Sequence, residues 1–272
     1  MSEELSELLD LAKLAARLAA KVHRSALERG GFEVQAKGST TDLVTEIDRE
    51  AERKMVEAIQ ARRPNDSIVG EEGASIEGDS GVRWIIDPLD GTTNFIHGYP
   101  AHSVAVGVEI EGRRKLGVVQ NTFSNRIYAG IVGGLATCDE RAIAVRHERA
   151  LANALVATGF LPDASVRLLQ ADLLREVLPR VRDIRRSGCP SLDICDVASG
   201  SLDAFYECGL GQWDIAGAAA IAEAAGAKVL LLHPRVLPDP LLIVANANLA
   251  GALVSLFEET GVVERASSTH TA

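Results

Sequence analysis

The sequence predicts an α+β half followed by an α/β half, in which helices cover the sheets. Three observations lead to this fold class. The chain opens with long amphipathic helical patterns, its middle alternates apolar runs with turn signals, and its last third alternates strand-like and helix-like segments. With 272 residues, the chain is long enough for two closely packed units, since domains usually run to ~50–250 residues. We expect the halves to be residues 1–145 and 146–272.

Two helices are expected at the start of the chain. Apolar residues recur at three- and four-residue spacing over residues 3–28, and Gly30-Gly31 ends this pattern. A second helical pattern runs over residues 42–62. Thr45 and Asp48 are three residues apart on it and therefore share one face of the predicted helix.

Strands that end in carboxylates follow. Residues 67–69 form a short apolar run that leads into Glu71, and residues 82–86 form another that leads into Asp87. Residues 101–132 alternate apolar runs with turn signals, which predicts an antiparallel meander. We therefore expect carboxylates at the ends of buried strands in the first half.

The second half is expected to alternate strands and helices, after a charged stretch without a clear pattern. Runs rich in β-branched and aromatic residues indicate strands, and apolar residues at helical spacing indicate helices. The predicted strands are 154–157, 203–207, 228–232 and 241–245, and the predicted helices are 164–181, 194–199 and 214–225.

Composition excludes several classes of protein. Hydrophobic residues make up 47% and charged residues 24%, as in ordinary globular proteins. The formal charge of -10 and the lack of a basic stripe disfavour nucleic-acid binding, which needs cations to neutralise phosphates. No apolar run approaches the ~18 residues of a membrane span, so no membrane partner is expected.

The cysteines and the start of the chain indicate a cytoplasmic protein. The chain has four cysteines, and no two of them form a CxxC pair. We therefore expect reduced thiols rather than a zinc knuckle or redox motif. The acidic beginning Met1–Glu4 has no basic region followed by an apolar core, so no secretion signal is predicted.

The segment from Asp87 to Thr92 has the residue types of a metal and phosphate site. Asp87 ends an apolar run, and ligands of open α/β sheets bind beyond the carboxyl ends of strands. Asp90 follows three residues later, while Pro88 restricts the backbone and Gly91 permits a close approach. Thr92 adds a hydroxyl and an N–H group at an expected helix start, where anions bind well.

Carboxylates without neighbouring Cys or His select hard cations, and Mg²⁺ is the commonest of these at phosphate sites. Glu71 and Asp214 are the best candidates to complete the ligand set. Asp214 is expected immediately before a helix, where it would also be the N-cap. In a site with two ions ~3.5–4 Å apart, Asp87 could bridge both.

Three segments resemble, in order and spacing, the signatures of the inositol monophosphatase family. They are Gly70-Glu71-Glu72, the stretch from Trp84 to Phe95, and the stretch from Trp213 to Ala218. A lone Asp-Pro-x-Asp would be a weak signal, but three ordered motifs are specific. The resemblance extends over residues 5–262. It implies a layered α-β-α-β-α sandwich, usually dimeric, and a lithium-sensitive magnesium phosphatase.

The resemblance also implies the metal ligands. One ion would be held by Glu71, Asp87 and the Leu89 carbonyl, and another by Asp87, Asp90 and Asp214. Two or three Mg²⁺ ions are expected, with Mn²⁺ as a possible substitute.

Catalytic and substrate contacts are implied in the same way. Thr92, with Asp48 or Thr45 nearby, would orient and activate the attacking water, and Glu71 is counted with these catalytic residues. Glu207 would accept hydrogen bonds from substrate hydroxyls, and Lys37 would lie near the metals. The implied substrate-binding set is Glu71, Leu89, Asp90, Gly91, Thr92, Gly188, Cys189, Pro190, Glu207 and Asp214.

The chain departs from the family pattern away from the metal ligands. Relatives usually carry small residues after Gly188, whereas this chain has Cys189-Pro190, which leaves the contacts to the sugar side open. Residues 133–137 lack the usual Asn-Gly hairpin, and residues 232–241 are proline-rich and shortened. In isolation from the other motifs, Asp90-Gly91 would be interpreted as a turn and Glu207 as a solvated charge at the end of a strand.

We therefore expect hydrolysis of a small polyol phosphate monoester, most simply myo-inositol 1-phosphate. The alternatives within the class are histidinol phosphate, fructose 1,6-bisphosphate and 3′-phosphoadenosine 5′-phosphate, although Asn94-Phe95 resembles the inositol branch. An alternative of another class is a regulator that binds phosphate compounds without turnover. Its mark would be a missing metal ligand, and none is missing in this sequence. A cytoplasmic homodimer is expected.

Overall fold

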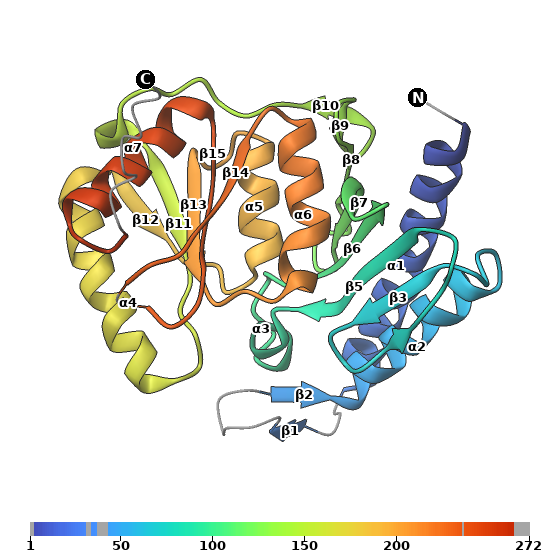
Figure 1. The fold of residues 1–272 in the computed structure, drawn as a ribbon. Coiled ribbons are helices and arrows are strands. Elements are labelled where there is room, and N and C mark those ends of the chain that lie inside the picture. The colour runs from blue at the N-terminus through green and yellow to red at the C-terminus, as the bar shows by residue number, and fades with distance from the viewer. Residues whose placement is uncertain (1–2, 31–33, 37–42, 236, 264–272) are drawn as a thin grey trace.

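The computed structural model describes residues 3–30, 34–36, 43–235 and 237–263, and it shows five layers. Helices and sheets alternate across the molecule from one side to the other (Figure 1). The predicted α-β-α-β-α sandwich is confirmed. From one outer layer through the central one to the other, the helices are α1 (Glu3–Arg29) with α2 (Glu46–Gln60), α5 (Pro190–Ala198) with α6 (Gln212–Ala224), and α4 (Ala164–Val177) with α7 (Ala247–Glu259).

The first sheet has eight strands in the order β10-β9-β8-β7-β6-β5-β3-β4. β3 and β5 are parallel and the other neighbours are antiparallel. Its central strands are almost wholly buried, because α1 and α2 cover one face and α6 covers the other. The bounds are β3 (Ser67–Gly70), β4 (Ser75–Ile76), β5 (Val82–Asp90), β6 (Ser103–Ile110), β7 (Arg113–Asn121), β8 (Ile127–Ile131), β9 (Ala136–Cys138) and β10 (Arg141–Ile143).

The second sheet has five strands in the order β12-β11-β13-β15-β14. β11 runs parallel to β12 and β13, while β15 is antiparallel to β13 and β14. The bounds are β11 (Leu155–Thr158), β12 (Asp183–Arg185), β13 (Ala204–Cys208), β14 (Lys228–Leu232) and β15 (Leu241–Ala245). The remaining elements are β1 (Val34–Ala36), β2 (Leu43–Thr45), α3 (Thr92–Ile96) and two 3-10 turns, Leu151–Asn153 and Leu178–Arg180.

Small residues let α6 lie directly on the first sheet. A Cβ on Gly117 of β7 would overlap the carbonyl oxygen of Gly217 in α6, and one on Gly107 of β6 would lie 2.6 Å from the Cβ of Ala216. Only glycine permits such a close approach between two backbones. This contact sets the height of α6 above the sheet, and so the position of Asp214 in its first turn.

Several element boundaries differ from those predicted. The second helix begins at Glu46 rather than near residue 42, because Leu43–Thr45 pairs with Val34–Ala36 as a strand. α5 begins at Pro190 instead of residue 194, since proline is well suited to the first turn of a helix. The meander continues through β9 and β10 into the charged stretch that showed no clear pattern.

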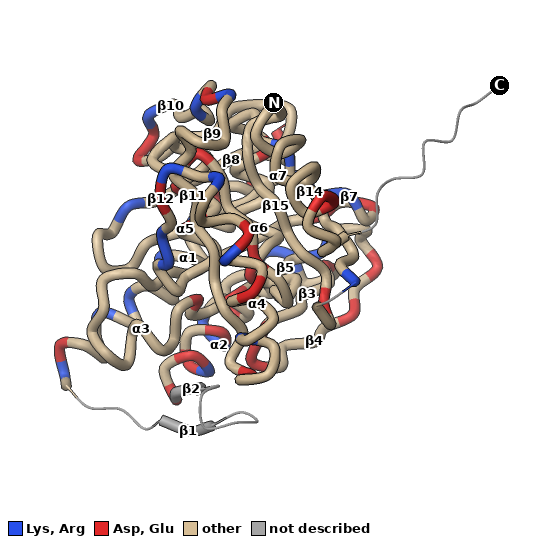
Figure 2. Tube along the Cα trace, turned by 90° about the vertical axis from the view of Figure 1, so that its left-hand side faces the viewer, with Lys and Arg blue, Asp and Glu red and all other residues tan. Residues whose placement is uncertain are grey.

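Charged residues of both signs are distributed along the chain. Figure 2 shows Lys and Arg interspersed with Asp and Glu along the chain, in keeping with the formal charge of -10. Among the described residues, no helix has both the length and the apolar character needed to cross a membrane.

Candidate active site

A β-bulge in β5 brings Asp87 and Asp90 together. In a regular strand, residues three apart point to opposite faces of the sheet. Here the pairing with β6 shifts between Asp87 and Asp90, which oppose Ala105 and Ser103. The extra residue lies at Pro88-Leu89, where proline could not donate a ladder hydrogen bond in any case. Leu89 instead donates its N–H to Oδ1 of Asp87 at 3.0 Å.

Asp214 joins these two carboxylates from the other half of the chain. Carboxylate oxygens of Asp87, Asp90 and Asp214 all lie within 4.8 Å of one another. Asp214 is the third residue of α6, so the expectation that it precedes the helix as N-cap is wrong. Gly211 occupies the cap position, and Oδ2 of Asp214 accepts its N–H at 2.7 Å. This bond orients the Asp214 side chain toward the start of the helix.

The electrostatics of the cluster favour a bound cation. Burial, and then the nearby charges of Glu71, Asp90 and Asp214, raise the pKa of Asp87 well above its usual value. Burial likewise raises the pKa of Asp90 to about 6, although donors from Ser191 and Cys189 oppose this shift. Oδ2 of Asp87 is buried without a hydrogen-bond partner among the described residues. A divalent ion bound to these oxygens would compensate for both the burial and the repulsion.

Asp90 is held by residues of the 189–191 segment. Its Oδ2 accepts the N–H of Ser191 at 2.8 Å and the Ser191 hydroxyl at 2.5 Å, and the Cys189 thiol lies 3.1 Å away. These donors leave Oδ1 as the oxygen available to a metal. Sequence reasoning missed Ser191. The Cys189-Pro190 pair was the available signal, because proline at a helix start leaves the next backbone N–H without a partner inside the helix.

Thr92 lies between the bulge and α2. Its hydroxyl is 3.2 Å from Oδ1 of Asp48 and 3.1 Å from the Leu89 carbonyl oxygen. Asp48 is 1% exposed, so its carboxylate is kept from bulk water. The structure thus brings together Thr92, Asp48 and the Leu89 carbonyl. The side chain of Thr45 and all of Lys37 lie outside the described part of the chain.

Asn94 of α3 connects the residue before Gly188 to the loop that leads into β6. Its Nδ2 donates to the carbonyl oxygens of Ala101 and Ser187, at 2.6 and 2.9 Å. Gly188 has a φ of 83°, and a Cβ there would collide with the Arg186 guanidinium. Glycine is therefore needed at this turn. Pro190 is the first residue of α5.

Glu207 is a buried carboxylate on β13. It is 8% exposed, and a Cβ on Gly159 would overlap both of its oxygens. Burial, and then the charges of Asp193, Asp214 and Asp90, raise its pKa well above the usual value, whereas Arg186 opposes the shift. The reading of Glu207 as a solvated surface charge is therefore wrong. Asp193 and Arg186, which accompany it, were not identified from the sequence.

Comparison with known proteins shows which family this chain resembles. The family model described as "Inositol monophosphatase family" matches residues 4–261. The chain belongs to the inositol monophosphatase family. Proteins of this family depend on metal, and the carboxylates of Asp87, Asp90 and Asp214 are close enough together to hold a metal ion.

Relatives of this family member carry two kinds of name. A Mycobacterium tuberculosis protein named inositol-1-monophosphatase SuhB is 41% identical over 80% of this chain and 78% of its own length. A Pasteurella multocida protein named Nus factor SuhB is 36% identical over 83% of this chain and 85% of its own length. The solved structure of the suhB protein from Bartonella henselae has a TM-score of 0.85 and 30% identity, covering 93% of this chain and 99% of that one.

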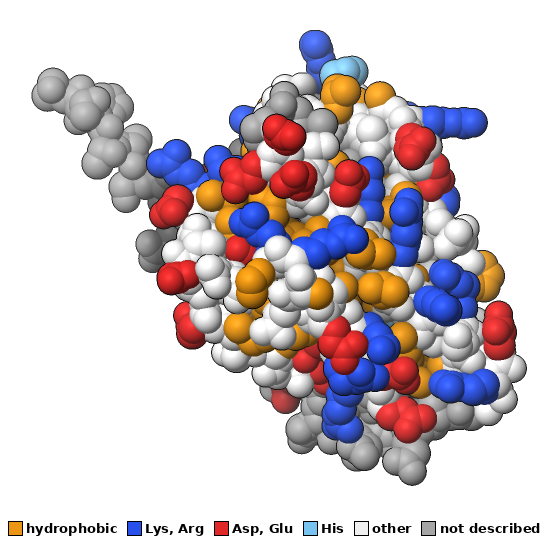
Figure 3. Space-filling model, turned by 90° about the vertical axis from the view of Figure 1, so that its right-hand side faces the viewer, with side chains coloured by type: hydrophobic (Ala, Val, Ile, Leu, Met, Phe, Trp, Pro, Cys, Tyr) orange, Lys and Arg blue, Asp and Glu red, His pale blue; other side chains and the backbone are white. Residues whose placement is uncertain are grey.

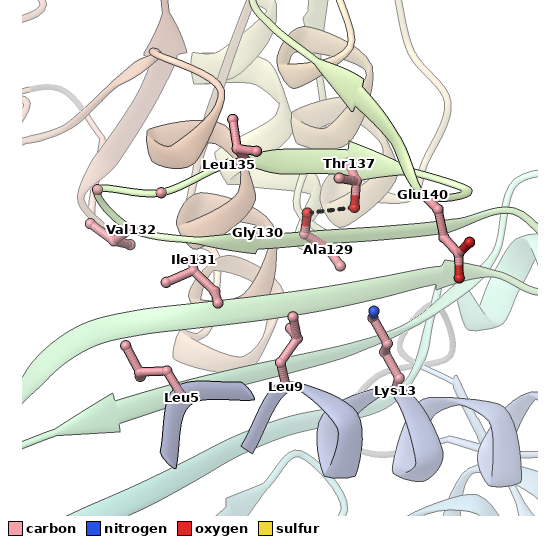
Figure 4. Close-up of a pocket in the computed structure, with 12 residues that line it drawn as sticks. Leu5, Leu9, Lys13, Ala129, Gly130, Ile131, Val132, Leu135, Thr137 and Glu140 are labelled. Carbon is pink, nitrogen blue, oxygen red and sulfur yellow. Dashed lines mark hydrogen bonds between the residues drawn. The ribbon is translucent and has the colours of Figure 1, made fainter. Parts of the chain in front are cut away.

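This member of the inositol monophosphatase family also has a separate apolar groove beside α1. Figure 3 shows hydrophobic side chains gathered on that face between charged ones. The groove, of about 660 Å³, runs between α1 and the β8–β9 hairpin. In Figure 4, Leu5 and Leu9 face Ile131, and Lys13 and Glu140 lie at one end. The charged residues of its lining are Lys13 and Glu140, whereas the three carboxylates of the candidate site lie at the β5 bulge and the start of α6.

Proposed function

We propose that this protein hydrolyses the phosphate monoester of a small polyol, with myo-inositol 1-phosphate as the first candidate and Mg²⁺ as the cofactor. Convergence of Asp87, Asp90 and Asp214 within 4.8 Å carries this proposal. Carboxylate clusters of this kind bind hard divalent cations, which in turn bind phosphate oxygens. Glu71 and the Leu89 carbonyl would complete the ligand set, as the family resemblance implies.

Bound divalent ions would stabilise negative charge on the phosphate and lower the pKa of a coordinated water. The chain itself prepares the proton transfer. Asp48 lies 3.2 Å from the Thr92 hydroxyl and would accept the hydrogen bond that this hydroxyl donates. The Thr92 oxygen is then left to accept a hydrogen bond from the attacking water and orient it toward phosphorus.

The substrate alcohol would lie toward Glu207. Its carboxylate is buried, and its charge is opposed by three other acidic groups, so it gains strongly from hydroxyl donors. A polyol supplies several such donors, whereas a simple alkyl or aryl alcohol does not. The backbone at Gly91-Thr92, where α3 begins, would receive the phosphate.

A panel of phosphate esters tests this proposal. Purified protein is assayed for phosphate release from inositol 1-phosphate, histidinol phosphate, fructose 1,6-bisphosphate and 3′-phosphoadenosine 5′-phosphate. Each ester is tested with Mg²⁺, Mn²⁺ or EDTA. We expect inositol 1-phosphate to give the highest kcat/KM, and EDTA to abolish turnover. Asp87→Asn is the matched inactive variant.

Other outcomes separate the rival functions. Preference for another ester would retain the phosphatase and change its substrate. If no ester were hydrolysed with either metal, while phosphate still bound, the protein would be a ligand-binding regulator. A binding protein without turnover is included among the outcomes because some relatives are named Nus factor rather than phosphatase. A homodimer, a cytoplasmic location and lithium inhibition stay predictions from the family resemblance.

A further inference from the structure

Glu52 is a buried carboxylate on α2 that the proposed reaction does not use. It is 7% exposed, and glutamate is rarely so buried without partners. Oε2 of Glu52 accepts the backbone N–H of Glu72 at 2.9 Å, and Oε1 accepts that of Ala74 at 3.0 Å. Both oxygens therefore hold the turn that follows β3, and this turn begins with Glu71.

Gly70 lets the turn lie against this carboxylate. A Cβ on Gly70 would overlap Oε2 of Glu52 and lie 2.8 Å from its Cδ. The backbone of the turn is also tied elsewhere, since Gly70 donates to the Ala74 carbonyl at 2.8 Å and Glu71 donates to the Ile86 carbonyl at 3.3 Å. The turn is thus fixed to β5 on one side and to α2 on the other.

Glu71 lies beside the end of β5, because its N–H donates to the carbonyl of Ile86, the residue before Asp87. After burial, the charge of Glu71 is the first of the nearby charges that raise the pKa of Asp87, ahead of Asp90 and Asp214. We infer that Glu52 is a positioning residue for Glu71, which holds the 70–74 turn so that the Glu71 carboxylate meets Asp87. This inference rests on the proposed function, because Glu71 has this role only if the cluster binds metal.

The same helix holds the other metal-binding segment. Asp48 lies four residues before Glu52, one turn earlier on the same face of α2, and contacts Thr92 after the bulge. Asp48 thus contacts the 87–92 segment, while Glu52 contacts the 70–74 turn. α2 is anchored beneath them by buried Ala51, Met55 and Ile59. One rigid helix therefore sets the distance between the two loops that supply the ligands.

Glu52→Gln tests this role. The amide keeps the size of the side chain, but its NH₂ group cannot accept the N–H that one carboxylate oxygen now accepts. Loss of a partner that orients a metal ligand typically costs ~10–100-fold in metal affinity, and we expect a loss in that range for Mg²⁺ binding without substrate. In the metal-free protein, we expect faster hydrogen exchange at the amides of Glu72 and Ala74. At saturating Mg²⁺, kcat should change less than the metal affinity does.

Gly70→Ala tests the same contact from the opposite side, because the new methyl group displaces the Glu52 carboxylate without altering it. It should weaken Mg²⁺ binding as Glu52→Gln does. Glu57→Gln is the matched control, since Glu57 is on α2 but 51% exposed and paired with Arg53 and Lys54.

Two results overturn the inference and one overturns its basis. Glu52→Gln and Gly70→Ala proteins that bind Mg²⁺ like the wild type, even if less stable, would make Glu52 a structural residue only. An equal loss of affinity in Glu57→Gln would remove the specificity of the effect. Failure of the wild-type protein to bind Mg²⁺ would instead refute the proposed function.

Discussion

Replacing Asp90 by Asn should make the metal-free protein more stable and magnesium-dependent hydrolysis much slower. Oδ2 of Asp90 accepts two donors from Ser191 and lies 3.1 Å from the Cys189 thiol. The amide of Asn would therefore place its oxygen toward Ser191 and its NH₂ group toward Asp87 and Asp214. A hydrogen-bond donor would then stand where a metal needs an oxygen ligand.

The two effects have different magnitudes. Carboxylate oxygens that lie within 4.8 Å of each other repel by at least about 3.5 kcal/mol when both are charged, at an effective dielectric constant of ~20. Because burial raises the pKa of Asp90 to about 6, Asp90 carries its charge above that pH, and its repulsion with neighbouring charged carboxylates is relieved below it. Weaker hydrogen bonds from Ser191 offset part of the gain, which leaves about 1–2 kcal/mol of stabilisation at pH 8. Loss of ~3 kcal/mol of transition-state stabilisation by metal lowers the rate roughly 100-fold.

The assay combines thermal unfolding in EDTA with magnesium-dependent hydrolysis of inositol 1-phosphate. A gain of 1 kcal/mol corresponds to about 2–4 °C in Tm for a chain of this size. Asp172→Asn on α4 is the control, because Asp172 is 71% exposed. Near-normal hydrolysis by Asp90→Asn would refute the ligand assignment. A lower Tm in EDTA would refute the repulsion argument.

Three further predictions concern single side chains. Glu207→Gln should raise KM for inositol 1-phosphate and leave that for an aryl phosphate nearly unchanged; equal effects on both esters would remove Glu207 from the polyol side. Thr92→Val removes the hydroxyl next to Asp48 and should lower kcat ~10²–10⁴-fold without changing Mg²⁺ affinity, both read from a magnesium titration of the rate. Burial lowers the pKa of His23 to about 3, whereas a histidine in the unfolded chain has a pKa of ~6.5. Between these two pH values the unfolded state binds more protons, so the free energy of unfolding falls as the pH falls. From pH 8 to pH 5 this costs about 2 kcal/mol, and urea unfolding of His23→Gln should lack that part of the loss; an unchanged pH dependence would contradict it.

Local sequence predicted that a buried strand ends with two nearby carboxylates, as β5 does. Asp87, Pro88 and Gly91 impose their backbone preferences on their immediate neighbours, so the end of a buried strand with two nearby carboxylates could be read directly. Helices and strands with strong periodicity were predicted for the same reason. The start of α2 was placed too early, because strand pairing of Leu43–Thr45 depends on a partner elsewhere in the chain.

Partners distant in sequence could not be found in this way. Ser191 meets Asp90 across 101 residues, and Glu52 reaches Glu72 across 20. Nothing in the neighbourhood of either residue indicates its partner. Their roles appear only when α5 packs against the first sheet and α2 lies beneath the turn after β3.

By itself, the sequence determined the residue types of the site, the segment that carries them and the family whose fold they need. The tertiary structure decided which carboxylate oxygens accept hydrogen bonds from the protein and how near Asp214 comes to Asp87. It also decided that Glu207 is buried rather than solvated. The physical reason is that residue chemistry and backbone preference are local properties. Burial, repulsion and hydrogen bonding depend on distances that only the packing of sheets and helices defines.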